Sequence, residues 1–116
     1  MDFISETVAR LQEYTSRKET AASLEKKLAN NHAARRNELE LYLEETKLWL
    51  RVMNRALSAL TEDEFLVLYR MYINRERNSI DRLCDELGLS DRRSVYKRRD
   101  RALRHLTIML YGVTER

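Results

Sequence analysis

Apolar residues recur along this chain at intervals of three and four, the spacing of α-helices that bury one face. The clearest run lies within residues 34–60, at Leu39, Tyr42, Thr46, Trp49, Met53, Ala56 and Leu60. It forms a heptad seam over three repeats, and Leu43, Leu50 and Leu57 widen it. We expect this helix to pack against more than one neighbour, and we interpret Trp49 as a packing residue rather than part of a ligand site.

Residues 2–28 carry a sparser apolar stripe, which includes Leu11 and Leu24, and this predicts a helix with a thin core that needs a partner. Asn30-Asn31-His32 is the expected break, because asparagine disfavours helix interiors and tolerates turns. One continuous helix through this region stays open, since no proline or glycine forces a stop. For residues 1–60 we predict an antiparallel helical hairpin or coiled coil, which serves in oligomerisation or polymerase contact.

Residues 61–116 begin with a predicted capping box, in which Thr61 and Glu64 satisfy each other's free backbone amides. The expected elements are a helix from 61 to about 74, a polar turn at 75–78, a short helix over 80–87 and a long helix over 91–111. Ser90 is the expected N-cap of the long helix, with Asp91 in its first turn. The apolar tail at 106–111 is expected to fold onto the 61–74 helix or onto a partner chain.

The short helix and the residues after it follow the pattern of a helix-turn-helix motif. Ile80, Leu83, Cys84 and Leu87 form its apolar stripe. Gly88 follows where a helix C-terminus needs a left-handed residue, and Leu89 is then expected to enter the core. The long basic helix comes next, and its expected buried face consists of Val95, Ala102, Leu106 and Met109. We therefore predict that 61–116 is a helix-turn-helix DNA-binding domain.

Positive charge is concentrated on that long helix. The 116-residue chain has a net charge of only +3, yet residues 92–105 hold seven Lys/Arg and a single Asp. A charge run on a helix is usually just a solvated face, and that interpretation stays open here. The preceding short helix and glycine turn favour the alternative, in which the basic face enters the major groove of DNA.

Composition narrows the class of protein. There is no proline, and glycine occurs only at 88 and 112, which favours an all-α fold. Cys84 is the sole cysteine, so we expect a reducing, cytoplasmic setting and a buried thiol. No apolar run suggests a membrane span or signal peptide. His32 and His105 are isolated from other metal-ligating residues, and no phosphate-binding glycine loop exists. We expect no enzyme activity, no cofactor, no metal and no small-molecule substrate.

The chain also resembles a known family over its second half and, more loosely, over its first. The residues that carry the resemblance are Leu60-Thr61-Glu62-Asp63-Glu64, Val67-Leu68, Tyr72, Ile80-Asp81-Arg82-Leu83, Leu87-Gly88-Leu89-Ser90, Ser94-Val95-Tyr96-Lys97-Arg98-Arg99-Asp100-Arg101-Ala102-Leu103, Leu106 and Leu110-Tyr111-Gly112. This pattern is similar to region 4 of bacterial sigma factors. It is closer still to the sigma-like regulators of phages and prophages of the ArpU and RinA kind, which switch on late genes.

The resemblance implies that the last helix reads promoter or operator DNA. On matching positions, Arg93, Ser94 and Lys97 reach base edges, and Arg92, Arg98 and Arg101 contact phosphates. Tyr96 completes the candidate DNA-binding set. Because Arg98 stands where sigma factors usually have an apolar residue, Val95 and Ala102 are expected to close the core, with the Tyr96 ring as a further contributor. No counterpart of the promoter-melting sigma region 2 is present, which indicates an accessory regulator rather than a complete sigma factor.

The function that we expect is therefore a sequence-specific, DNA-binding transcriptional regulator, phage-derived and acting at promoters of phage genes. One helix-turn-helix reads few base pairs, so a homodimer or a second anchor on RNA polymerase is expected through residues 1–60. The main alternative is a protein-interaction adaptor that binds RNA polymerase or a phage protein through its helical hairpin. RNA binding is a third interpretation, although such arginine-rich helices rarely come with a helix-turn-helix scaffold.

Overall fold

The computed structural model describes residues 2–30 and 34–115, and the regular elements within these ranges are all helical. The prediction of an all-α chain is confirmed. In chain order the elements are α1 (Phe3–Leu28), α2 (Arg36–Ser58), α3 (Glu62–Leu68), the π-helix η1 (Tyr69–Ile73), α4 (Ser79–Leu87) and α5 (Arg92–Tyr111). Within the described ranges, no helix is both long enough and apolar enough to cross a membrane.

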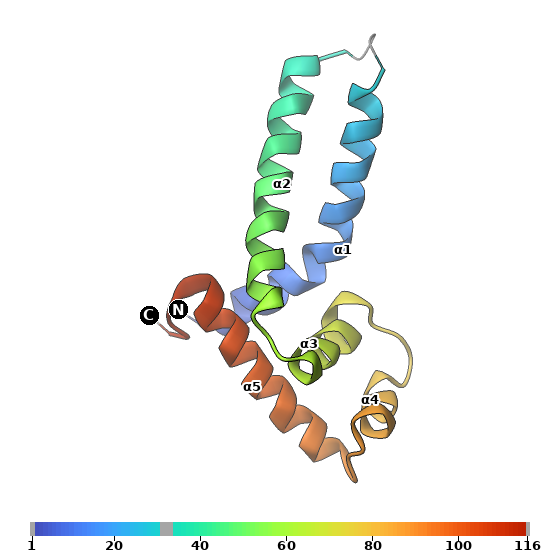
Figure 1. Cartoon of the computed structure of the whole chain (residues 1–116), viewed down its shortest axis with the longest axis vertical. Coiled ribbons are helices and arrows are strands. Elements are labelled where there is room, and N and C mark those ends of the chain that lie inside the picture. Colours follow the sequence, from blue (N-terminus) through green and yellow to red (C-terminus); the bar gives the residue numbers. More distant parts are fainter. Residues whose placement is uncertain (1, 31–33, 116) are drawn as a thin grey trace.

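Helices α1 and α2 lie side by side and run in opposite directions, and their connected ends project away from the other helices (Figure 1). The first helix ends at Leu28, as predicted, whereas Asn31 and His32 lie outside the described residues. The predicted seam of α2 is fully or partly buried from Thr46 onwards. Thr46, Met53 and Ala56 are buried, but Tyr42 is 48% exposed because the seam there extends beyond the main core.

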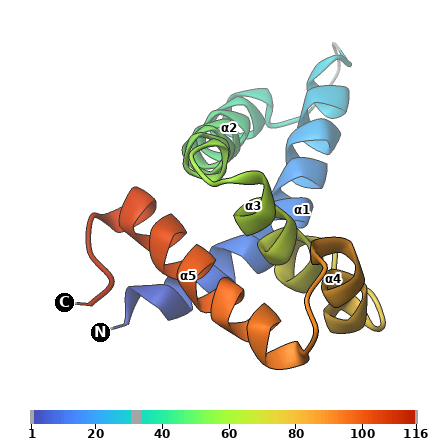
Figure 2. The same ribbon diagram turned by 60° about the horizontal axis from the view of Figure 1, so that its bottom comes forward.

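The larger apolar cluster combines both halves of the sequence. Its buried members are Leu11, Met53, Ala56, Leu57, Leu68, Ala102, Leu103 and Leu106, which come from α1, α2, α3 and α5. Figure 2 shows α5 running beside α3 and across the first turns of α1. Because burial of apolar surface is the main favourable term in folding, segments 1–60 and 61–116 depend on one shared core.

The two ends of the described chain meet at the start of α1. The Phe3 amide donates to the Thr114 carbonyl at 3.1 Å, and the Phe3 and Tyr111 rings stack with centroids 4.9 Å apart. The apolar tail was expected to fold onto the 61–74 helix or onto another chain. Leu106 does share a buried cluster with Leu68 of α3, whereas Tyr111 at the end of the tail contacts α1. Met109 was placed on the buried face of the last helix, and that prediction is wrong. It is 47% exposed, because Leu106, Thr107 and half-buried Leu110 face the core instead.

The predicted capping box at the start of α3 is confirmed. The Thr61 amide donates to Glu64 Oε1 at 3.0 Å, and the Glu64 amide donates to Thr61 Oγ1 at 3.2 Å. The helix then widens into η1, whose end is marked by a 2.7 Å bond from the Asn74 amide to the Tyr69 carbonyl five residues earlier. The polar turn follows and leads into α4.

Helix α4 packs on a second, smaller cluster, whose buried members are Val67, Leu83 and Val95. Gly88 ends α4 in the predicted left-handed conformation, with φ of 66°. Leu89 then packs against the cluster as expected. Cys84 is only partly buried there, and its thiol donates to the Asp91 carbonyl at 3.5 Å. This second cluster therefore holds α4 and the first half of α5 against α3.

Candidate nucleic-acid interface

Helix α5 is fixed by its buried face and by a cap at its start. Val95, Ala102, Leu103 and Leu106 are buried. The predicted N-cap, Ser90, is wrong by one residue: Asp91 accepts from the Ser94 amide at 2.9 Å and from the Ser94 hydroxyl at 2.9 Å. These two bonds lower the pKa of the Asp91 carboxyl, and the bond from the Ser94 amide has the larger effect. The lowered pKa keeps the capping carboxylate ionised. A carboxylate also offers two oxygens to the free amides of the first turn, where serine offers one.

The outward face of α5 carries four exposed cations, at Arg93, Lys97, Arg101 and Arg104. Their spacing of four, four and three residues keeps them on one side of the helix. Within residues 2–30 and 34–115, none of these four side chains forms an ion pair. The single acid of α5, Asp100, is bound by Arg99 at 2.8 Å. The face therefore presents four cations that have no ion-pair partner among the described residues.

The other predicted site residues have partners within the fold. Arg92 donates to both carboxylate oxygens of Asp81 on α4, at 3.1 and 3.2 Å. Arg98 lies 3.5 Å from the Asp63 carboxylate at the start of α3; the Asp63 side chain is exposed and the Arg98 side chain is partly buried. Ser94 is committed to the cap. These three side chains brace α5 as well as lying close to the cationic face.

Tyr96 lies beside the cationic face rather than in the core. The residue is 39% exposed, and the Arg99 guanidinium lies over its ring, 5.0 Å from the ring centroid. The expectation that this ring helps to close the core is therefore wrong. Leu103 takes part in that closure instead, since it is buried in the larger cluster.

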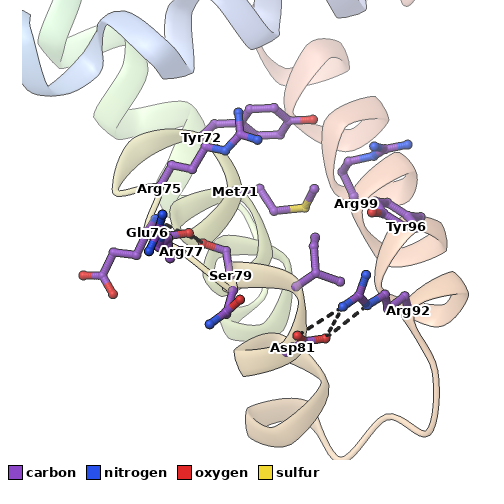
Figure 3. A pocket seen from close by; sticks show the side chains of 12 residues that line it. Met71, Tyr72, Arg75, Glu76, Arg77, Ser79, Asp81, Arg92, Tyr96 and Arg99 are labelled. Atoms are coloured by element: carbon purple, nitrogen blue, oxygen red, sulfur yellow. Dashed lines mark hydrogen bonds and ion pairs between the residues drawn. The ribbon is translucent and has the colours of Figure 1, made fainter.

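An open cavity of about 770 Å³ adjoins the start of α5. Figure 3 shows Arg92, Tyr96 and Arg99 on the α5 side, and Arg75 with Arg77 from the loop before α4 on the other side. Two acids, Glu76 and Asp81, also line it. Each of these acids forms an ion pair: Glu76 pairs with Arg82, and Asp81 pairs with Arg92. Arg75 and Arg77 form no ion pair with any described residue, so the cavity adds positive charge beside the helix.

Sequence reasoning missed these two loop arginines as candidate contacts. The segment 75–78 was interpreted as a polar turn, and nothing in its composition shows that the turn faces α5. Arg104 was counted in the charge run but left out of the candidate set. Its position eleven residues after Arg93 was the available signal, because that interval brings a side chain back to the same helix face.

Two partly buried ionisable groups stand next to the basic helix. Burial raises the pKa of the Tyr72 phenol at the cavity wall, and the nearby Arg99 opposes this shift. Glu64 accepts from Thr61 and lies 3.2 Å from Nδ1 of His105 on α5. Burial opposes its ionisation, but the Thr61 amide and then His105 outweigh it, so the pKa of Glu64 is lowered. His105 therefore contacts α3.

Comparisons with protein-family models, with curated proteins and with solved structures find no match for this chain. Among the described residues, no group of three or more His, Cys, Asp or Glu side chains is placed to hold a metal ion.

Proposed function

We propose that this protein binds double-stranded DNA through α5 and acts as a sequence-specific transcriptional regulator. The observation that carries the proposal is the row of four exposed cations without ion-pair partners, Arg93, Lys97, Arg101 and Arg104, opposite the buried face of the same helix. Uncompensated cations on a rigid element attract a polyanion, because binding releases the counterions condensed on its phosphates.

The dimensions of α5 suit duplex DNA. At 1.5 Å per residue, the row from Arg93 to Arg104 is about 16 Å long, and the major groove is about 12 Å wide, so one helix fits. Arginine is the side chain best suited to pair with guanine, each good bidentate pair being worth about 1–3 kcal/mol of discrimination. In this proposal Arg93 and Lys97 reach base edges from the first turns, and Arg101 and Arg104 lie against phosphates.

In the same proposal α4, the turn at Gly88 and α5 form a helix-turn-helix. Support comes from the left-handed Gly88, the packing of Leu89 and the shared cluster of Leu83 and Val95. The sequence resemblance adds that the protein is a phage-derived regulator similar to sigma region 4, acting at phage promoters. The Arg92–Asp81 ion pair joins the two helices of this motif.

A charge-reversal pair tests the DNA face. The variant Arg93→Glu with Lys97→Glu is expected to bind duplex DNA at least tenfold more weakly, measured by fluorescence anisotropy on random duplexes and on a duplex selected from a randomised library. The matched control is Lys26→Glu with Lys27→Glu, which makes the same change in net charge at the exposed end of α1. It is expected to bind as the wild type does.

Three outcomes contradict the proposal. Equal loss in both variants indicates a general charge effect, and no loss in the Arg93/Lys97 variant favours the protein-interaction adaptor. Stronger binding to a structured RNA than to any duplex DNA favours the RNA interpretation. Circular dichroism of each variant verifies that the helices are intact, since both substituted pairs lie on exposed positions.

A further inference from the structure

Helix α2 has a second apolar face, which no other part of the described chain covers. Leu41 is 58% exposed, Leu48 is 56% exposed and Val52 is 43% exposed. At 100° per residue these three side chains fall within about 40° of one another on the helix. They point away from the face that carries Met53 and Leu57, which are buried in the shared core. Figure 1 shows that one side of α2 faces α1 and the opposite side faces solvent.

Charge is divided along the same helix. Its first half carries Glu38, Glu40, Glu44 and Glu45, and its second half carries Lys47, Arg51 and Arg55. Lys47 pairs with Glu25 of α1, and Glu40 pairs with Arg36. By contrast, no ion pair within the described residues involves Glu44, Arg51 or Arg55. These three lie along one edge of the exposed apolar face, because Arg51 and Arg55 follow Glu44 at intervals of seven and eleven residues.

We infer that this face binds a second copy of the chain, with the two α2 helices antiparallel. A twofold axis near the middle of α2 brings one copy's edge against the same edge of the other copy, reversed in direction. Glu44 of each copy then lies beside Arg51 and Arg55 of the other, and the stripes of Leu41, Leu48 and Val52 bury one another. A parallel pairing instead sets the acidic half beside the acidic half and the basic half beside the basic half, which is unfavourable.

We expect this dimer to be of moderate affinity. The contact is one helix face from each copy, which is at the small end of stable interfaces, so we expect a dissociation constant in the micromolar range. It relies on α2 alone and on none of the residues of α5. The proposal of a dimer and the proposal of DNA binding can therefore be refuted separately, because their tests use different variants and different measurements.

Substitution of Leu48 tests the face. Sedimentation velocity on the full chain, from low micromolar to several hundred micromolar, is expected to show a concentration-dependent dimer. Leu48→Glu is expected to weaken it at least tenfold, because two leucines leave the contact and two buried charges replace them. The matched control is Ile108→Glu, at a residue 46% exposed on α5, and it is expected to leave the dimer intact. A wild type that is monomeric throughout, or a dimer lost in the control and not in Leu48→Glu, overturns the inference.

Exchange of charges tests the orientation. Glu44→Lys alone and Arg51→Glu alone are each expected to weaken the dimer. The double variant restores opposite charges between positions 44 and 51 across the twofold axis and recovers part of the lost affinity, since the lysine at position 44 still lies beside Arg55. In a parallel dimer, Glu44→Lys alone relieves repulsion and strengthens association. That result, or a double variant weaker than both single ones, refutes the antiparallel arrangement. Both residues are exposed, and helical content by circular dichroism confirms that each variant is folded.

Discussion

The hydroxyl oxygens of Thr7 and Thr107 lie 2.7 Å apart, buried between α1 and α5. Each hydroxyl is also within hydrogen-bonding distance of a carbonyl four residues earlier in its own helix, at 3.0 Å from Phe3 and 2.6 Å from Leu103. A hydroxyl donates only one proton, so one threonine donates to the other while the second donates to its own helix. This pair ties the first helix of the sequence to the proposed DNA-binding helix.

We predict that the two threonines are energetically coupled. Thr7→Val and Thr107→Val should each lower the free energy of unfolding by about 1 kcal/mol, because each leaves the remaining buried hydroxyl without its cross-helix partner. The double variant should lose less than the sum, since two valines of similar shape pack together without an unpaired polar group. Denaturant unfolding measures the cycle. Ser16→Ala, at an exposed hydroxyl on α1, is the control and should stay near the wild type. Strictly additive losses would contradict the coupling.

The shared core leads to a prediction about the isolated second half. A fragment of residues 61–116 lacks Leu11, Met53 and Leu57, which cover Leu68 and Leu106 in the full chain. We expect this fragment to lose cooperative thermal unfolding, because the larger cluster is open to water on one side. Circular dichroism melts of the fragment and of the full chain make the comparison. A cooperative transition of the fragment close to that of the full chain would show that the smaller cluster suffices.

The sequence predicted local features of this fold well, because their causes are local. Thr61 and Glu64 satisfy each other within one turn, and Gly88 meets a requirement of its own backbone, so both are visible in a short window. The contacts that the end of α5 makes with α1 were not predictable in this way. The contacts of Tyr111 with Phe3 and of Thr107 with Thr7 join residues about a hundred positions apart, and no periodicity within either helix identifies the other as its partner.

In the candidate site, too, local features were predictable from the sequence and contacts between separate elements were not. The exposed row at Arg93, Lys97 and Arg101 could be placed on one face from helical spacing alone. Spacing could not show that Asp81 engages Arg92, because α4 and α5 are brought together by the turn between them. It also could not place Arg75 beside α5, since a loop without periodicity carries no signal of direction.

At acidic pH the Glu64 carboxylate, at the start of α3, should lose its contribution to the free energy of unfolding. The pKa of Glu64 is lowered in the folded state, so its carboxylate stabilises the fold above the unfolded value of about 4.5, and this contribution disappears as the pH falls through the folded pKa. We therefore expect the stability advantage of the wild type over Glu64→Gln to be complete above about pH 5.5 and to shrink towards about pH 3. Urea unfolding at several pH values measures it. Glu62→Gln, on an exposed acid of the same turn, should show a smaller and flatter difference, and an advantage for Glu64 independent of pH contradicts the prediction.

The salt dependence of DNA binding should respond in opposite directions to two substitutions. The logarithm of affinity falls linearly with the logarithm of salt concentration, with a slope of about −0.9 for each phosphate neutralised. Arg101→Ala removes an exposed cation and should make the slope shallower by about one. Asp81→Asn removes the carboxylate that engages Arg92, so that this guanidinium becomes available to a phosphate and the slope steepens by up to the same amount.

The cost of Asp81→Asn to folding should be small, because ion pairs at exposed positions contribute about 1 kcal/mol or less. Anisotropy titrations on one duplex at several salt concentrations give both slopes, and thermal melts verify the folding of each variant. Ser58→Ala, on α2 and away from α5, is the reference variant. If Asp81→Asn binds DNA more weakly at every salt concentration while remaining folded, Arg92 acts through the geometry that Asp81 imposes on α5, and its role is to orient the helix rather than to hold a phosphate.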